Sequence, residues 1–182
     1  SLKRLKLFYP YRAFYKVPYL VPPWEADEIK LFQGYLFNAQ QPPFGNFEEA
    51  VKKKYKTSSN IVFVDACRQA LEALLKELSF ARESEIIMPV LCCSIVARAI
   101  QEWGLVPSLA DIGEDLCLTV DSIKKALSAK TKGVILVHAG GAAASEYTKV
   151  VDFCHKNGLY LIDNAAGAWG NQADGIWLGA RG

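Results

Sequence analysis

Short runs of apolar residues alternate with amphipathic stretches over residues 60–182. Uninterrupted apolar runs predict strands that are buried on both faces, and apolar residues three or four positions apart predict the helices that cover them. The predicted strands are 61–64, 85–89, 106–110, 134–137 and 159–162, and the predicted helices are 65–78, 94–103, 121–127 and 145–156. This alternation predicts an α/β fold of three layers (α/β/α), with helices on both sides of a mostly parallel sheet.

Single residues mark where several of these helices begin or end. Asp65 and Asp121 each stand at the start of a predicted helix, and Asn46 precedes a further predicted helix at 47–55. We expect all three to act as N-caps, because a short polar side chain accepts hydrogen bonds from the first free backbone amides. Gly104 follows the helix predicted at 94–103 and is expected to end it.

Residues 1–45 lack this regular pattern. They hold six of the eight prolines, which interrupt long elements. One short helix is predicted at 24–35, where acidic residues fall in the first turn. The sequence therefore predicts an irregular N-terminal arm with a short helix over residues 1–45, followed by the α/β region over residues 46–182.

Composition limits the classes of partner. The net charge of +2 is too small to indicate nucleic-acid binding, and the longest apolar run, 86–97, contains Pro89 and is shorter than the ~20 residues that a membrane helix needs. The five cysteines show no repeated spacing, which predicts free thiols in a reducing compartment such as the cytoplasm. The spacing of Cys92, Cys93 and His138 matches no common ligand set, so no metal site is predicted.

The stretch Leu159–Gly170 is the strongest candidate for a site. Its apolar start predicts a buried strand, and Asp163 and Asn164 stand where that strand ends, followed by small residues. In open α/β sheets ligands bind just beyond the carboxyl ends of the strands. His138 stands at the end of another predicted strand, where it is either a site residue or a structural one.

Seven short motifs in chain order resemble the DegT/DnrJ/StrS family of sugar aminotransferases. They are Gly45–Ala50 (GNFEEA), Ala66–Leu71 (ACRQAL), Glu85–Pro89 (EIIMP), Gly104–Ile112 (GLVPSLADI), Leu118–Asp121 (LTVD), Thr131–His138 (TKGVILVH) and Asp163–Gly167 (DNAAG). The resemblance covers residues 17–182, the N-terminal half of the family's length. It implies the large domain of the pyridoxal-phosphate (PLP) dependent aspartate-aminotransferase fold (fold type I), with PLP as the cofactor.

The resemblance places Cys67 and Arg68 at the helix start that receives the cofactor phosphate, where the family carries a Gly-Thr pair. A helix N-terminus suits an anion because free amides and the helix dipole converge there. Arg68 either adds charge to the phosphate site or is a solvated helix residue. Cys93 takes the position of the residue that stacks on the pyridine ring, although filling the core is an equal alternative for a thiol.

The resemblance also implies that Asn164 stands where the family has the carboxylate that faces the pyridine nitrogen. An amide cannot supply the charge that keeps that nitrogen protonated. Asp163 is a poor substitute, because the neighbouring residue on a strand points to the opposite face. Gly167 replaces a glutamine that contacts the ring. The lysine that binds the cofactor covalently is expected beyond Gly182, so the chain is expected to be a truncated N-terminal part.

Three functional hypotheses follow. The first is an aminotransferase that moves an amino group from an amino acid, commonly glutamate, to a keto sugar nucleotide. The second, favoured by Asn164 and Gly167, is a homologue that keeps the fold and has lost the chemistry. The third is an unrelated α/β binding domain. The family resemblance also implies a homodimer with the site at its interface, and the aromatic segment at 8–15 is expected to face the partner.

Overall fold

The computed structural model describes residues 44–57 and 60–180. The chain divides into two units, Ser1–Glu49 and Ala50–Gly182, and the second unit holds the sheet. α2 (Phe44–Tyr55) crosses the boundary between them. The helix predicted at 24–35 and the aromatic segment at 8–15 lie outside the described residues.

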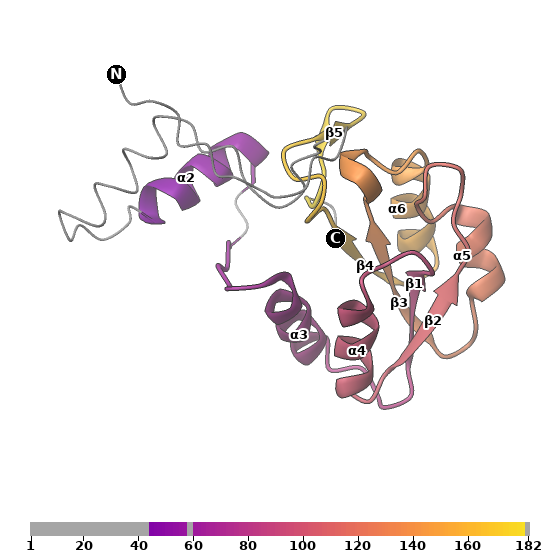
Figure 1. Ribbon diagram of the computed structural model, residues 1–182. Coiled ribbons are helices and arrows are strands. Elements are labelled where there is room, and N and C mark those ends of the chain that lie inside the picture. The colour runs from indigo at the N-terminus through magenta and orange to yellow at the C-terminus, as the bar shows by residue number, and fades with distance from the viewer. Residues whose placement is uncertain (1–43, 58–59, 181–182) are drawn as a thin grey trace, which may run out of the picture. The chain divides into compact units, whose positions relative to one another are not determined.

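Four parallel strands form the main sheet in the order β2-β1-β3-β4 (Figure 1). They are β1 (Glu85–Pro89), β2 (Val106–Ala110), β3 (Thr131–Val137) and β4 (Tyr160–Asn164). The two central strands, β1 and β3, are almost wholly buried, whereas β2 and β4 at the edges are more exposed. The predicted three-layer α/β architecture with a parallel sheet is therefore confirmed for this part of the chain.

Helices cover both faces of the sheet (Figure 1). The remaining elements are α3 (Cys67–Leu78), α4 (Ser94–Glu102), α5 (Val120–Ala126), the short 3₁₀ helix η1 (Ala139–Gly141), α6 (Tyr147–Lys156), and the hairpin strands β5 (Gln172–Ala173) and β6 (Ile176–Trp177). α3 and α4 lie on one face, and α5 and α6 lie on the other. None of the helices in the described part of the chain combines the length and the apolar composition needed to span a bilayer.

Alternate residues of the strands enter two separate cores, as the twofold repeat of a strand requires. On the α3/α4 face, Ile86 and Ile135 pack with Leu71, Leu75 and Ile100. On the α5/α6 face, residues of the strands pack with residues of the two helices. The strand residues are Ile87, Val134, Leu136 and Leu161, and the helix residues are Ile123, Tyr147 and Val150. Burial on both faces explains why the central strands read as continuous apolar runs in the sequence.

The strand predicted at 61–64 does not form, so that prediction is wrong. These residues pair with none of the described strands, and Val62, Phe63 and Val64 are exposed. A strand depends on hydrogen bonds to a neighbour, and β4 is the last strand of the sheet on its side in the described part of the chain. The local apolar run indicated the strand but carried no information on its partner.

Three of the predicted helix caps are also wrong. α3 begins at Cys67 with Ala66 as its N-cap, and the backbone N–H of Asp65 donates instead to the Gln69 side chain. Asp121 lies inside α5, and Asn46 lies inside α2. The prediction for Gly104 is confirmed: it follows the end of α4 with φ +72°, a left-handed conformation that glycine adopts without strain.

Thr119 is the residue that caps α5. Its hydroxyl accepts the Ser122 N–H at 3.1 Å, and the Thr119 N–H donates to the Ser122 hydroxyl at 3.0 Å, which forms a reciprocal capping box. We expect Thr119→Ala to lower the free energy of unfolding by about 1 kcal/mol, measured by urea denaturation. Asp121→Ala is the control: it removes only an exposed ion pair with Lys125 and should cost no more than about 0.5 kcal/mol. A cost at Asp121 that equals the cost at Thr119 would contradict the assignment of the cap.

Candidate functional site

At the end of β4, a charged residue and a neutral polar residue lie on opposite faces of the sheet. The register pairs Asp163 with Leu136 and Asn164 with Val137. Leu136 belongs to the α5/α6 core, whereas Val137 packs against the α3/α4 core. Asp163 therefore lies on the α5/α6 face and Asn164 on the α3/α4 face, as the alternation of a strand predicts.

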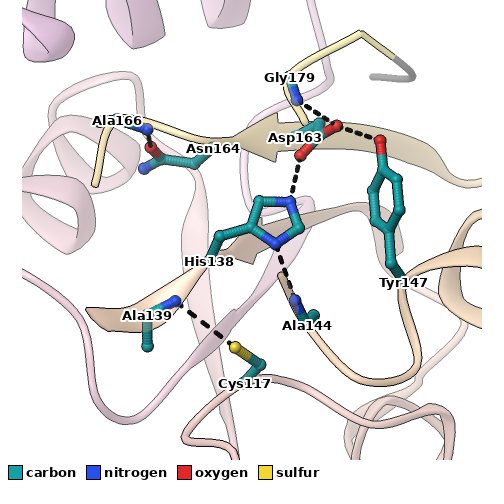
Figure 2. A network of polar contacts seen from close by, with 9 residues as sticks. All are labelled: Cys117, His138, Ala139, Ala144, Tyr147, Asp163, Asn164, Ala166 and Gly179. Atoms are coloured by element: carbon teal, nitrogen blue, oxygen red, sulfur yellow. Dashed lines mark hydrogen bonds and ion pairs between the residues drawn. The ribbon is translucent and has the colours of Figure 1, made fainter. Parts of the chain in front are cut away.

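Asp163 is the centre of a buried hydrogen-bond network (Figure 2). One carboxylate oxygen, Oδ1, lies 2.8 Å from Nε2 of His138. The other, Oδ2, accepts the hydroxyl of Tyr147 at 2.5 Å and the backbone N–H of Gly179 at 2.8 Å. The side chains of Asp163 and His138 are 1% and 0% exposed, so water cannot replace these donors. The network joins the ends of β3 and β4, the first turn of α6 and the segment after β6.

The hydrogen bonds of His138 fix its tautomer. Nδ1 accepts the backbone N–H of Ala144 at 3.0 Å, which requires a lone pair on that nitrogen. The ring proton therefore sits on Nε2 and is donated to Asp163. The ring of His138 also packs edge-on against Tyr147, with 5.2 Å between the ring centroids. Of the two alternatives for His138, the structure shows a buried residue that is fully engaged within the fold.

Opposing effects act on the charge of Asp163. Burial alone would raise the pKa of its carboxyl, because a charged group loses its solvation. Hydrogen bonds from His138, Tyr147 and Gly179 favour the carboxylate and outweigh burial, so the pKa is lowered. Asp163 is thus an ionised group whose oxygens are already taken by donors from the fold.

The sequence places Asp163 at the end of a strand in the candidate site but indicates neither its contact with His138 nor any role for Tyr147. The signal available was the pair formed by His138 and Asp163, which stand at the ends of two predicted strands. Their contact depends on β3 and β4 being neighbours in the sheet and on both side chains leaving the same face. The sequence pattern gives neither the strand order nor the register.

Among the residues that the structure describes, the Asn164 side chain makes one hydrogen bond. Its Oδ1 accepts the backbone N–H of Ala166 at 3.1 Å, which closes a turn directly after β4 (Figure 2). Its backbone carbonyl accepts the His138 N–H at 3.2 Å, which holds the end of β4 against β3. The Nδ2 group donates to no atom of the described residues. Within residues 44–57 and 60–180, Asn164 therefore keeps two N–H donors without an acceptor at the carboxyl edge of the sheet.

The other predicted cofactor residues lie around the same face. Cys67 is the first residue of α3, and Cys93 is the N-cap of α4; both are exposed. Burial raises the pKa of the neighbouring Cys92, the backbone amide of Cys93 lowers it by hydrogen bonding, and the thiols of Cys93 and Cys67 raise it further. Gly167 lies exposed in the segment after the Asn164 turn, where an added Cβ would be 3.6 Å from the His138 carbonyl oxygen.

Arg68 is turned toward carboxylates. Its guanidinium contacts Glu72 at 2.5 Å, one turn further along α3, and Glu102 at 2.9 Å, the last residue of α4. Hydrogen bonding to Glu72 and the charges of both glutamates raise the pKa of Arg68. Most of its positive charge is therefore balanced within the pair of helices, and the α3 amides are the better candidates for holding an anion.

A cavity of about 620 Å³ lies on the other side of β4 from β3. Its walls come from the outer edge of β4, from α3 and from an aromatic group in which Tyr55 stacks on Trp169 at 6.2 Å between ring centroids. Asn164, Cys67 and Cys93 are not among its lining residues. This cavity is therefore separate from those three predicted cofactor residues.

Comparison with known proteins identifies the type of domain. The chain is 31% identical over 137 residues to GDP-perosamine synthase of Vibrio cholerae and 30% identical over 123 residues to the dTDP-4-dehydro-2,3,6-trideoxy-D-glucose 4-aminotransferase of Saccharopolyspora spinosa. These matches cover 75% and 67% of the chain but only 36% and 32% of the relatives. The chain thus spans about a third of the length of the curated relatives it matches.

Solved structures agree on the fold. The aminotransferase TlmJ from Streptoalloteichus hindustanus superposes with a TM-score of 0.78 at 22% identity, over 87% of this chain and 44% of that one. The GDP-4-keto-6-deoxy-D-mannose-3-dehydratase of E. coli, solved with bound hydrated PLP, superposes with a TM-score of 0.73 at 21% identity. The model of the DegT/DnrJ/EryC1/StrS aminotransferase family matches residues 31–182, a narrower range than the predicted 17–182. The chain therefore belongs to the DegT/DnrJ/EryC1/StrS aminotransferase family.

Proposed function

We propose that this chain forms part of the large domain of a PLP-dependent sugar aminotransferase. The reaction is transfer of an amino group from an amino acid, with glutamate as the donor, to a keto sugar nucleotide. The observation that carries the proposal is the family match over residues 31–182, together with relatives named as an aminotransferase and a transaminase of dTDP sugars. We also propose a homodimer and a cytoplasmic location, in keeping with the free cysteines of the described residues.

The described residues offer a binding place for part of the cofactor. Cys67 and Cys93 stand at the starts of α3 and α4, the two helices on the face of the sheet that carries Asn164, and helix N-termini suit a phosphate group. Gly167 and its small neighbours leave room beside the end of β4. We propose Cys67, Arg68, Cys93, Asn164 and Gly167 as the residues of this chain that contact the cofactor. The α3 amides would hold the phosphate, because Glu72 and Glu102 balance most of the charge of Arg68.

The fit is incomplete at the ring nitrogen. When bound, PLP supplies an electron sink whose strength depends on a protonated pyridine nitrogen. Asn164 carries no charge, and Asp163 is on the opposite face with its oxygens occupied. The described residues therefore do not fit the protonated ring, and no catalytic step is assigned to them. This mismatch favours a second candidate function, a homologue that retains the fold and binds ligands without efficient amino transfer.

One experiment separates the two functions. The purified protein is mixed with PLP and L-glutamate, and the cofactor absorbance is followed together with the 2-oxoglutarate released. A keto sugar nucleotide is then added, and the amino sugar product is measured by mass spectrometry. Aminotransferase function predicts a cofactor spectrum that changes with glutamate and a product that requires both substrates. A cofactor spectrum that glutamate does not change supports the second candidate.

A further inference from the structure

We propose that Asn164 selects a cofactor ring whose nitrogen carries no proton. The inference rests on the proposed function, because it assumes that a pyridine ring binds at the end of β4. It goes further by assigning the protonation state of that ring to one side chain and by making Asn164 a specificity-determining residue.

The orientation of the Asn164 amide is set by the turn that follows it. The backbone N–H of Ala166 needs an acceptor, and the Asn164 Oδ1 at 3.1 Å provides it. The amide nitrogen consequently points away from Ala166 (Figure 2). Reversing the amide would place an NH₂ group against the Ala166 N–H and leave that donor without its partner. The group that Asn164 offers to a ligand is therefore a donor.

Asn164 is also held rigidly. Asn164 pairs with Val137 of β3 in the sheet, and its backbone carbonyl accepts the His138 N–H at 3.2 Å. The Asp163 network fixes the preceding residue on the other face, through His138, Tyr147 and Gly179. A donor on such a support cannot easily move away from an incompatible ligand.

Asp163 cannot compensate for the missing charge. Its two oxygens already accept three donors, and its side chain is 1% exposed on the α5/α6 face. Reaching a ring on the α3/α4 face would require the end of β4 to rotate and would leave those donors unpaired.

The ring nitrogen is consequently faced by N–H donors and by no carboxylate of β4. An unprotonated pyridine nitrogen accepts a hydrogen bond from Asn164 Nδ2. A protonated ring would place its own N–H against the N–H of Asn164, and no carboxylate of β4 would offset the cost of burying its positive charge. The site thus favours the neutral ring nitrogen, which is the weaker electron sink.

The test uses pyridoxamine phosphate labelled with ¹⁵N in the ring, which binds without a covalent bond to the protein. The ¹⁵N chemical shift of the bound ring reports its protonation directly. We expect the unprotonated shift in the wild-type protein and the protonated shift in Asn164→Asp. Asn157→Asp is the matched control, because it makes the same change of charge at the exposed end of α6. It should leave the ring unprotonated.

Affinity gives a second readout. The N-methyl derivative of the ring carries a fixed positive charge and accepts no hydrogen bond. Relative to the unmethylated ring, we expect it to bind about tenfold more weakly to the wild type, and we expect this preference to be lost or reversed in Asn164→Asp. The extra methyl group is common to both proteins, so the change in preference isolates the side chain.

The outcomes are distinct. A protonated shift in the wild type overturns the selection by Asn164 while leaving cofactor binding intact. Absence of binding for every ring overturns both this inference and the proposed function. The wild-type shift alone decides the inference if the Asn164→Asp variant does not fold.

Discussion

The Asp163→Asn variant is expected to lose about 2–4 kcal/mol of its free energy of unfolding, because a buried carboxylate side chain that accepts three hydrogen bonds becomes an amide that can accept from only one side. The amide oxygen can still accept from His138, but the NH₂ group then faces the Gly179 N–H, and neither can accept from the other. The loss is to be measured by chemical denaturation, with amide hydrogen exchange at Gly179 and Ala144 as a local probe.

Asp152→Asn is the matched control for this variant. Asp152 lies exposed in the middle of α6, the helix that begins at Tyr147, so the same change of charge should alter the unfolding free energy by no more than about 0.5 kcal/mol. Equal losses in the two variants would show that the Asp163 network adds nothing beyond surface charge.

The same carboxylate should make stability depend on pH. Its pKa in the folded protein is lowered, whereas in the unfolded chain it lies near the ordinary value of about 3.9. Between these two values the unfolded chain binds more protons, so stability rises with pH. The contribution of Asp163 is therefore fully present above the unfolded pKa and is lost as pH falls through the folded pKa. The difference in unfolding free energy between wild type and Asp163→Asn should shrink across that acidic range, measured by denaturation at a series of pH values.

Most strands and helices of this chain can be predicted from the sequence, because the apolar patterns that indicate them are local. The strands at 85–89 and 106–110 were predicted at the bounds the structure shows, since apolar runs of five residues between helices indicate buried strands. The prediction of a strand at 61–64 is wrong because a strand needs a neighbour to pair with, and an apolar run does not show whether one is present. The prediction of Asp121 as the cap of α5 is wrong for a similar reason. Thr119 and Asp121 are both residue types that cap helices, and only the backbone geometry shows that Thr119 is the cap.

The sequence likewise predicts some features of the candidate site, and others required the structure. The positions of Asp163 and Asn164 at the end of a strand, and their opposite faces, follow from sequence alone. The partners of Asp163 do not, because Tyr147 comes from α6 and Gly179 from the segment after the β5–β6 hairpin. The direction of the Asn164 amide also required the structure, since it depends on the turn closed by Ala166. Sequence therefore predicted the faces of both residues, and the structure showed that the oxygens of Asp163 accept donors from the fold, whereas the Asn164 Oδ1 accepts the Ala166 N–H.

In the protein that includes the cofactor-binding lysine expected after residue 182, Asn164→Asp is expected to raise the rate of amino transfer from glutamate by about 10- to 1,000-fold. A carboxylate at 164 would keep the Ala166 N–H as a donor to one oxygen and turn the other toward the ring. An opposite charge at close range raises the pKa of a basic nitrogen by about 1–3 units, and each unit is a tenfold gain in the protonated fraction. The rate is to be measured in a single turnover, with PLP-loaded protein and L-glutamate, so that binding of the sugar nucleotide does not contribute.

The Asn157→Asp variant again serves as the control, and its rate should equal that of the wild type. An unchanged rate in Asn164→Asp, with cofactor bound in both proteins, would show that another group faces the ring nitrogen and that the end of β4 does not set its charge. A gain confined to Asn164→Asp would instead mean that the fold supports amino transfer and that one amide limits it. The Asp163 network would then have a clear role in this protein, because it leaves residue 164 as the only side chain of β4 that can decide the chemistry of the ring.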